Sequence, residues 1–265
     1  MQTKVSSEFM YQIFSLILAL IVVHTVYLTL IRPNANNLLE NQLAKEEAGE
    51  SYVAVRSFYI VIKDFEQEAC FILMIWACAI MGYKARCLID ERKLLNHQLL
   101  TIPEGTRILP KDARQISRPI QALSSTQKKG LIPRVLLIAL HRFDSTKNIQ
   151  DVSNAISEVL DKESDKLDSE LSMVRYIAWA IPSIGFIGTV RGIGEALSQA
   201  HKAVQGDIAG VTASLGVAFN STFIALVISI FLMFIVHQLQ LAQERLVLDS
   251  HDYCDNNLVR HLKTD

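Results

Sequence analysis

The hydrophobic residues of this chain are concentrated in four long runs without charges, rather than in the repeating stripes of a soluble domain. The runs comprise residues 10–31, 69–83, 176–190 and 208–236. A helix needs roughly 20 apolar residues to cross the hydrocarbon core of a bilayer. The pattern excludes an ordinary soluble globule and predicts an all-α, polytopic membrane protein with four transmembrane helices.

The first run, from Met10 to Ile31, contains 22 uncharged residues, which suffices for one crossing. We interpret it as a retained span rather than a cleaved signal peptide, because its apolar core is too long and the residues after it offer no A-x-A-like cleavage site. We interpret His24, inside the run, as a snorkelling or helix-packing residue, with a proton relay as the alternative.

The second and fourth runs depart from the length of a single crossing in opposite directions. Ala69 to Tyr83 has only 15 uncharged residues and follows several charged ones, including Glu66 and Glu68. We expect it to span the membrane, with these upstream charges near the lipid headgroups. Ile208 to Val236 has 29 uncharged residues, which predicts a tilted helix or one that continues past the membrane surface.

The basic residues predict the orientation of the chain. The segment from Lys84 to Ser172 carries 15 Lys and Arg residues, whereas Arg32 to Ser51 has two basic residues against four glutamates. Because basic residues accumulate on the cytoplasmic side, we expect both termini and the long middle segment to be cytoplasmic.

The chain therefore divides into four expected segments. An outer pair of transmembrane helices occupies residues 1–83, a cytoplasmic helical region 84–172, a transmembrane hairpin 173–240, and a cytoplasmic helical tail 241–265. Apolar residues recur every three or four positions between Val152 and Val174, which predicts an amphipathic helix. No Pro or Gly separates it from the third run, so we expect one uninterrupted rod.

The composition favours no other class of protein. The net charge of −1 provides no basic surface for nucleic acid. The four cysteines form no C-x-x-C pair and have no His spacing suited to zinc, so we expect no disulfide framework, metal site or cofactor. The stretch Gly192-Ile-Gly194 lacks the last glycine of a dinucleotide loop, and no P-loop, G-x-S-x-G or H-E-x-x-H motif occurs. We therefore expect no enzymatic activity.

The third run is rich in small residues. Gly185, Gly188 and Gly192 repeat at three- and four-residue spacing, so they lie near one face of the expected helix. Small residues let another backbone approach closely, which membrane helices need in the absence of a hydrophobic driving force. We assign these glycines, together with Pro182, to helix packing.

Polar residues in the last two runs have two interpretations. They are Thr189, Asn220, Ser221 and Thr222. The three hydroxyls, beside the Asn220 amide, either bond back to a carbonyl one turn earlier or line a narrow wet path. No Asp, Glu, Lys, Arg or His lies between Arg175 and Arg191 or between Asp207 and His237. If protons move along these helices, the exchanging acid must come from another polypeptide.

These residues resemble the MotA/TolQ/ExbB proton-channel family. The stretch Gly185-Phe-Ile-Gly-Thr-Val-Arg-Gly-Ile193 matches the family's Gly-hydrophobe-hydrophobe-Gly-Thr-Val-x-Gly-Ile pattern. Thr222 is followed by Ala225 and Leu226, where the TolQ/ExbB branch has Gly and Leu. The resemblance covers roughly residues 150 to 240. The four-span layout with a cytoplasmic N-terminus is closer to the flagellar stator branch.

The resemblance implies a homopentamer in the bacterial inner membrane, with the last two spans lining a central pore. It implies two single-span partners of the ExbD/TolR/MotB type, which supply a protonatable Asp, and a motor driven by the proton-motive force. Thr189 and Thr222 then face the pore near that Asp. Two alternatives stay open, namely a stand-alone transporter or channel and a non-conducting membrane scaffold.

Overall fold

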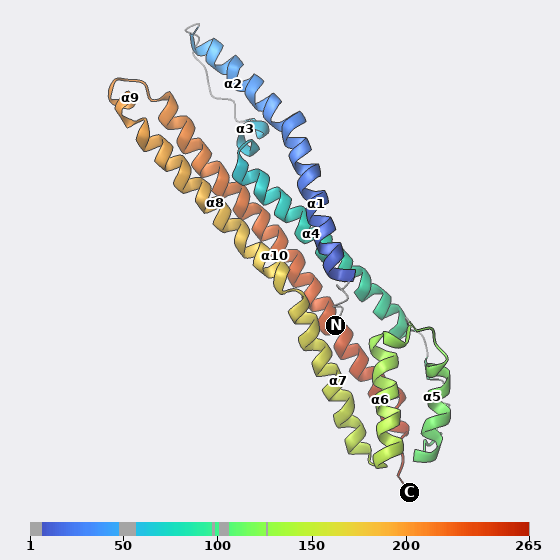
Figure 1. The fold of residues 1–265 in the computed structure, drawn as a ribbon. Coiled ribbons are helices and arrows are strands. Elements are labelled where there is room, and N and C mark those ends of the chain that lie inside the picture. Colours follow the sequence, from blue (N-terminus) through green and yellow to red (C-terminus); the bar gives the residue numbers. More distant parts are fainter. Residues whose placement is uncertain (1–6, 48–56, 97–98, 101–105, 126, 265) are drawn as a thin grey trace, which may run out of the picture. The chain divides into compact units, whose positions relative to one another are not determined.

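The computed structural model describes residues 7–47, 57–96, 99–100, 106–125 and 127–264, which are helical almost throughout (Figure 1). The helices are α1 (Ser7–Val26), the π-helical turn η1 (Tyr27–Ile31), α2 (Arg32–Glu47), α3 (Phe58–Ile62), α4 (Phe65–Asn96), η2 (Pro110–Asp112), α5 (Ala113–Gln121), η3 (Gln127–Lys129), α6 (Leu131–Thr146), α7 (Ile149–Glu170), α8 (Ser172–Ser198), α9 (Ala200–Val204), α10 (Ala209–Asn257) and η4 (Val259–His261). Within the described ranges there is no strand, only one isolated bridge between Ile108 and Leu262.

Four helical stretches are long and apolar enough to cross a membrane. They are Glu8–Asn41, Phe65–Leu95, Ile149–Ser198 and Ala209–His261. This confirms the predicted all-α fold with four candidate spans. The chain forms two compact units, the first made of Met1–Met81 and Met173–Val236 and the second of Gly82–Ser172 and His237–Asp265. Both α4 and α10 contribute residues to each unit.

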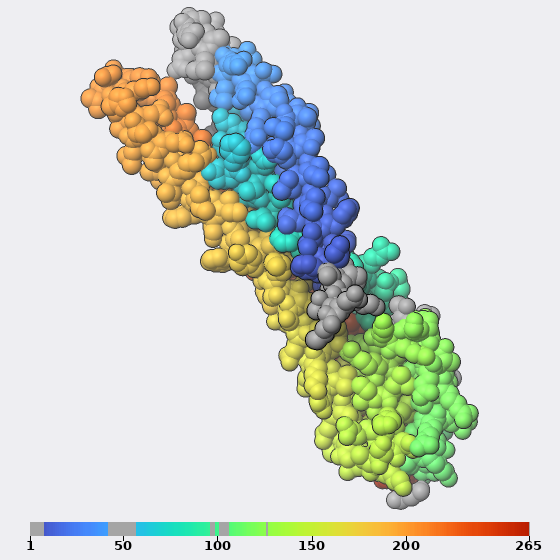
Figure 2. All heavy atoms as spheres, in the orientation of Figure 1, coloured from blue at the N-terminus to red at the C-terminus, as the bar shows by residue number. Residues whose placement is uncertain are grey.

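In the first unit, α8 and α10 lie side by side, α4 packs against both, and α1 and α2 lie on the outer side of α4 (Figure 1). The space-filling view shows a strip of α3 and α4 (cyan) between the surfaces of α1 and α2 (blue) and of α8 (light orange) (Figure 2). The buried residues of α1 and η1 recur every four positions, at Ser15, Ala19, Val23, Tyr27 and Ile31. This one face packs inward.

The outward surface of the first unit is strongly apolar. Phe14 on α1, Trp179 on α8, and Ile230 and Phe234 on α10 are all exposed. An exposed apolar surface of this extent is unfavourable in water and matches the environment of lipid chains.

The second span is longer than the predicted 69–83. Helix α4 begins at Phe65, and its candidate span runs to Leu95. Glu66 and Glu68 both bind side chains of other helices, and Glu68 is buried. Their position near the lipid headgroups stays a prediction.

The second unit packs around α6, whose apolar residues from Leu131 to Phe143 are largely buried. The predicted apolar stripe of α7 is present, with Val152, Ile156 and Leu160 buried. The predicted rod is helical from Ile149 to Ser198 except for a single turn residue, Leu171, between α7 and α8.

Candidate functional site

The two threonines of the family motifs lie together between α8 and α10. The Thr189 and Thr222 hydroxyls are hydrogen-bonded to each other. Thr189 Oγ1 also lies 3.1 Å from the carbonyl oxygen of Ala218, and Thr222 Oγ1 lies 3.2 Å from that of Gly185, so each hydroxyl has a carbonyl acceptor on the facing helix. Each threonine thus reaches the carbonyl that lies one turn before the other threonine, so the contact is reciprocal between the two antiparallel helices.

This close approach requires the small residues of α8. A Cβ added at Gly188 would lie 2.5 Å from Ser221 Cβ, and one at Gly192 would lie 2.7 Å from the backbone nitrogen of Ala218. A Cβ at Gly185 would collide with that of Ala225. All three glycines are buried and face α10. This agrees with the prediction, from their spacing, that they lie near one face of the helix.

Pro182 leaves one backbone carbonyl of α8 without its helical hydrogen-bond donor, and a residue of α10 supplies a donor in its place. A proline inside a helix has no N–H, so the carbonyl four residues earlier, that of Ala178, loses its helical partner. Ser229 Oγ donates to this oxygen at 3.0 Å. Sequence reasoning missed Ser229; the helical spacing identifies the carbonyl that Pro182 releases, but not which residue reaches it.

Ser221 and Asn220 have different surroundings from the threonine pair. Ser221 is buried, donates its hydroxyl to the Val217 carbonyl at 2.9 Å, and accepts from Gln67 Nε2 at 3.3 Å. Asn220 is half-buried, and no hydrogen bond joins it to the threonine pair among the described residues. The structure therefore brings Ser221 to α4 rather than to Thr189.

Three consecutive residues at the start of α4 reach three different parts of the first unit. Glu66 binds Arg191 of α8 through both oxygens, at 2.7 and 2.9 Å. Gln67 donates to Ser221 of α10. Glu68 binds both His24 of α1 and Arg32 of α2. We call Glu66, Gln67 and Glu68 the α4 polar triplet.

Sequence reasoning missed the polar triplet as a set of contacts. The signal was the group of charges before the second run, but the partner of Glu66 is 125 residues away and that of Gln67 is 154 residues away. The triplet adds an acid beside the last two spans. Although α8 and α10 carry no acid between Arg175 and Arg191 or between Asp207 and His237, α4 brings Glu66 against α8, and its Cγ lies 3.1 Å from where a Cβ on Gly188 would lie.

The triplet is electrically compensated. Charged groups taken out of water need close partners, because the cost of desolvation is several kcal/mol for each unpaired ion. Arg191 forms an ion pair with Glu66 and also binds Glu195 at 2.8 Å. Arg32 forms an ion pair with Glu68, and its guanidinium lies over the Phe65 ring, 4.4 Å from the centroid.

The comparison with protein families agrees with this geometry. Residues 127–251 match the model of the MotA/TolQ/ExbB proton channel family, and this range contains the threonine pair, the three glycines and Ser229. Over residues 127–251 the sequence is that of the MotA/TolQ/ExbB proton channel family. It is a multi-pass membrane protein with four candidate spans. Searches of curated proteins and of solved structures found no match.

The matched range covers α6 to α9 and most of α10. Helices α1 to α5 lie outside it, as do His24, Arg32 and the α4 polar triplet. The family match therefore bears on the α8–α10 contact, whereas the polar contacts of α1, α2 and α4 are known from this structure alone.

Proposed function

We propose that this protein is a non-enzymatic, proton-conducting subunit of a membrane motor driven by the proton-motive force. In this proposal five copies form a ring in the bacterial inner membrane, around a dimer of single-span subunits that supply a protonatable Asp. Both termini and the middle segment lie in the cytoplasm. The observation that carries the proposal is the reciprocal threonine pair of α8 and α10, which lies within the family match.

The hydroxyls of the pair have more acceptors than protons. Thr189 Oγ1 lies 3.1 Å from the Ala218 carbonyl and 3.3 Å from the Gly185 carbonyl, and it also contacts the Thr222 hydroxyl. A hydroxyl carries one proton and two acceptor lone pairs. It is therefore able to turn between these acceptors and present its oxygen or its proton to a carboxyl group on a neighbouring helix. This supports a place beside a titrating acid.

The exposed faces of the hairpin support assembly. Phe186 and Ile187 on α8 and Phe219 and Phe223 on α10 are exposed within a single copy of the chain. In lipid, helices associate through close packing rather than through a hydrophobic driving force. Such faces are available to neighbouring copies and to a partner helix.

The proposal is tested by measuring proton flux into vesicles with the tagged chain, purified either alone or with the single-span subunit that co-purifies. We expect flux only with the companion, and a native mass that contains five copies of the 29.7 kDa chain. Flux through the chain alone would favour the stand-alone channel. A stable monomer, or a ring without a companion, would favour the scaffold.

Substitution of the threonines tests the site itself. Thr189→Val and Thr222→Val remove a hydroxyl at nearly constant volume, and we expect each to lower the flux of the complex at least about tenfold, as expected for the loss of about 1.4 kcal/mol of barrier stabilisation. The matched control is Thr25→Val, because the Thr25 hydroxyl bonds only to the Ile21 carbonyl of its own helix. Normal flux in both pore variants would reduce the pair to a packing contact.

A further inference from the structure

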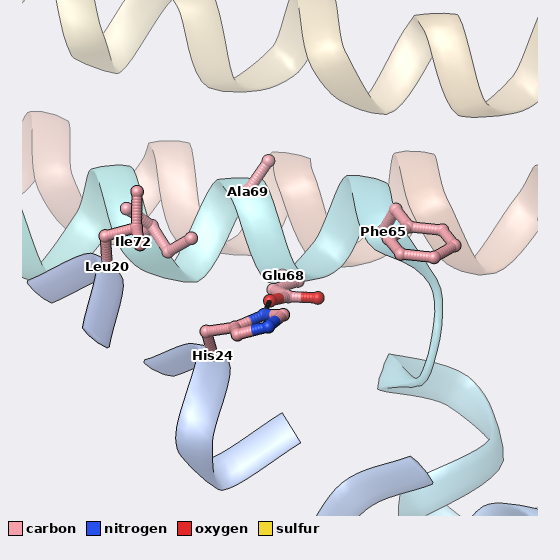
Figure 3. Close-up of a pocket in the computed structure, with 6 residues that line it drawn as sticks. All are labelled: Leu20, His24, Phe65, Glu68, Ala69 and Ile72. Atoms are coloured by element: carbon pink, nitrogen blue, oxygen red, sulfur yellow. Dashed lines mark hydrogen bonds and ion pairs between the residues drawn. The ribbon is translucent and has the colours of Figure 1, made fainter. Parts of the chain in front are cut away.

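A second group of titratable residues lies on the outer helices, away from the threonine pair. Figure 3 shows the imidazole of His24, on α1, directed at the carboxylate of Glu68, on α4. They lie at a groove whose other lining residues are apolar, namely Leu20, Phe65, Ala69 and Ile72. Arg32 binds the second oxygen of Glu68.

His24 lies within the first uncharged run rather than at its end. His24 is seven residues before Ile31, which corresponds to about 10 Å along a helix. Glu68 lies at the same level, because its Oε1 is 2.6 Å from His24 Nδ1. An ionisable cluster at this depth is costly to maintain, and in membrane proteins such clusters usually have a function.

The contact between His24 and Glu68 requires a shared proton. Two lone pairs would repel each other at 2.6 Å, so one hydrogen lies between Nδ1 and Oε1. In the neutral imidazole that has this hydrogen on Nδ1, Nε2 carries a lone pair. No described residue bonds Nε2 in the structure, and the His24 side chain is 49% exposed, whereas that of Glu68 is 8% exposed. The accessible nitrogen is therefore on His24, and the shielded oxygen is on Glu68.

We propose that His24 and Glu68 form a proton-binding site that belongs to this chain itself. A proton arriving from the groove forms an N–H bond at Nε2 of His24. The Nδ1–H bond then breaks and an O–H bond forms at Glu68 Oε1, which leaves a neutral imidazole and a neutral carboxylic acid. The charge of the site rises by one, because Arg32 stays cationic. The ligand is the proton, and the site is independent of the proposed pore and of any partner subunit.

Charged and titratable groups lie on the same helices as the site. From α1, η1 and α2 they are His24, Tyr27 and Arg32, and along α4 they are Asp64, Glu66 and Cys70. The carboxylate of Glu66 is held by Arg191 through two hydrogen bonds and has no histidine partner in the described structure. Glu66 therefore provides a matched control, one residue away on the same helix.

The test is infrared difference spectroscopy of the full chain in lipid nanodiscs, comparing pH 8 with pH 5. We expect the carbonyl band of a protonated carboxylic acid to appear at low pH in the wild type and in Glu66→Gln, and to disappear in Glu68→Gln. Retention of the whole band in Glu68→Gln, or its absence from the wild type, would overturn the proposal.

A second measurement keeps the proposal testable if Glu68→Gln fails to fold. Histidine labelled with ¹⁵N reports the protonation of each imidazole directly in the unaltered protein, and His24 is identified by the signal missing from His24→Gln. We expect the His24 nitrogens to change shift between pH 8 and pH 5. Constant shifts for His24 over this range would overturn the proposal, whatever the conduction of the complex.

Discussion

At the scale of single residues, the α8–α10 contact depends on backbone carbonyls that lack ordinary helical partners or are shared. Ser229 binds the Ala178 carbonyl that Pro182 leaves without its N–H. Thr189 and Thr222 share the Gly185 and Ala218 carbonyls with the helices themselves. These bonds give partners to backbone carbonyls inside candidate spans, where an unpaired backbone group is costly.

Ser229→Ala should destabilise the first unit by about 1 kcal/mol, because it leaves the Ala178 carbonyl without a donor. In a Pro182→Ala background the helical N–H returns, so the same change should cost markedly less. Unfolding in mixed detergent micelles measures both differences and gives the coupling energy. The matched control is Ser183→Ala, because Ser183 bonds only to the Trp179 carbonyl of its own helix. Equal costs in the two backgrounds would contradict the assignment.

At the scale of elements, the distance between α8 and α10 is set by glycines on one face of α8. The exposed face of the same helix has its own glycine, Gly194, around which nothing lies within 4 Å of an added Cβ. The glycines of α8 therefore differ in their surroundings. Those that face α10 set the distance between the two helices, whereas a Cβ added at Gly194 would contact no other described residue.

Gly188→Ala should destabilise the hairpin by about 1–3 kcal/mol, because its Cβ would lie 2.5 Å from that of Ser221 and the helices must separate. Gly194→Ala should be neutral or stabilising, by up to about 1 kcal/mol, since alanine favours helix and meets no neighbour. Thermal unfolding in the same detergent compares the two variants. A Gly188→Ala protein as stable as Gly194→Ala would contradict the observed packing.

Helix α4 is the element that holds the first unit together. Its polar triplet contacts α8, α10, α1 and α2 within a single turn of helix. The span predicted from residues 69–83 omitted this turn, because charges are ordinarily a sign that a transmembrane run has ended. Here Glu66 and Glu68 each have an oppositely charged partner, Arg191 and Arg32, within the packed first unit.

At the scale of the whole molecule, the proposed orientation is open to a direct test with the cysteines. Cys87 is exposed in the second unit, whereas Cys254 is buried there. A membrane-impermeant maleimide should label Cys87 in inverted membrane vesicles and leave it unlabelled in intact spheroplasts, because the second unit is proposed to be cytoplasmic. Cys87→Ser removes the signal and serves as the control. Labelling of Cys87 in intact spheroplasts would contradict the proposed orientation and place the second unit outside the cytoplasm.

The family assignment and the span count follow from properties of neighbouring residues. These signals are local in the sequence: the uncharged runs, the nine residues from Gly185 to Ile193, and the placement of Lys and Arg. None of them depends on which helices contact each other. The glycine face of α8 was likewise predictable, because helical spacing alone puts Gly185, Gly188 and Gly192 together.

Only the tertiary structure decided which polar groups meet. Glu66 with Arg191, Gln67 with Ser221 and Ser229 with the Ala178 carbonyl are pairs from distant parts of the chain. A helix surrounded by lipid is apolar on its outer face as well as its inner one, so its sequence carries little periodicity to mark the side that packs inward. The number of candidate spans therefore follows from local composition, whereas the polar contacts between spans depend on how complete helices are oriented toward one another.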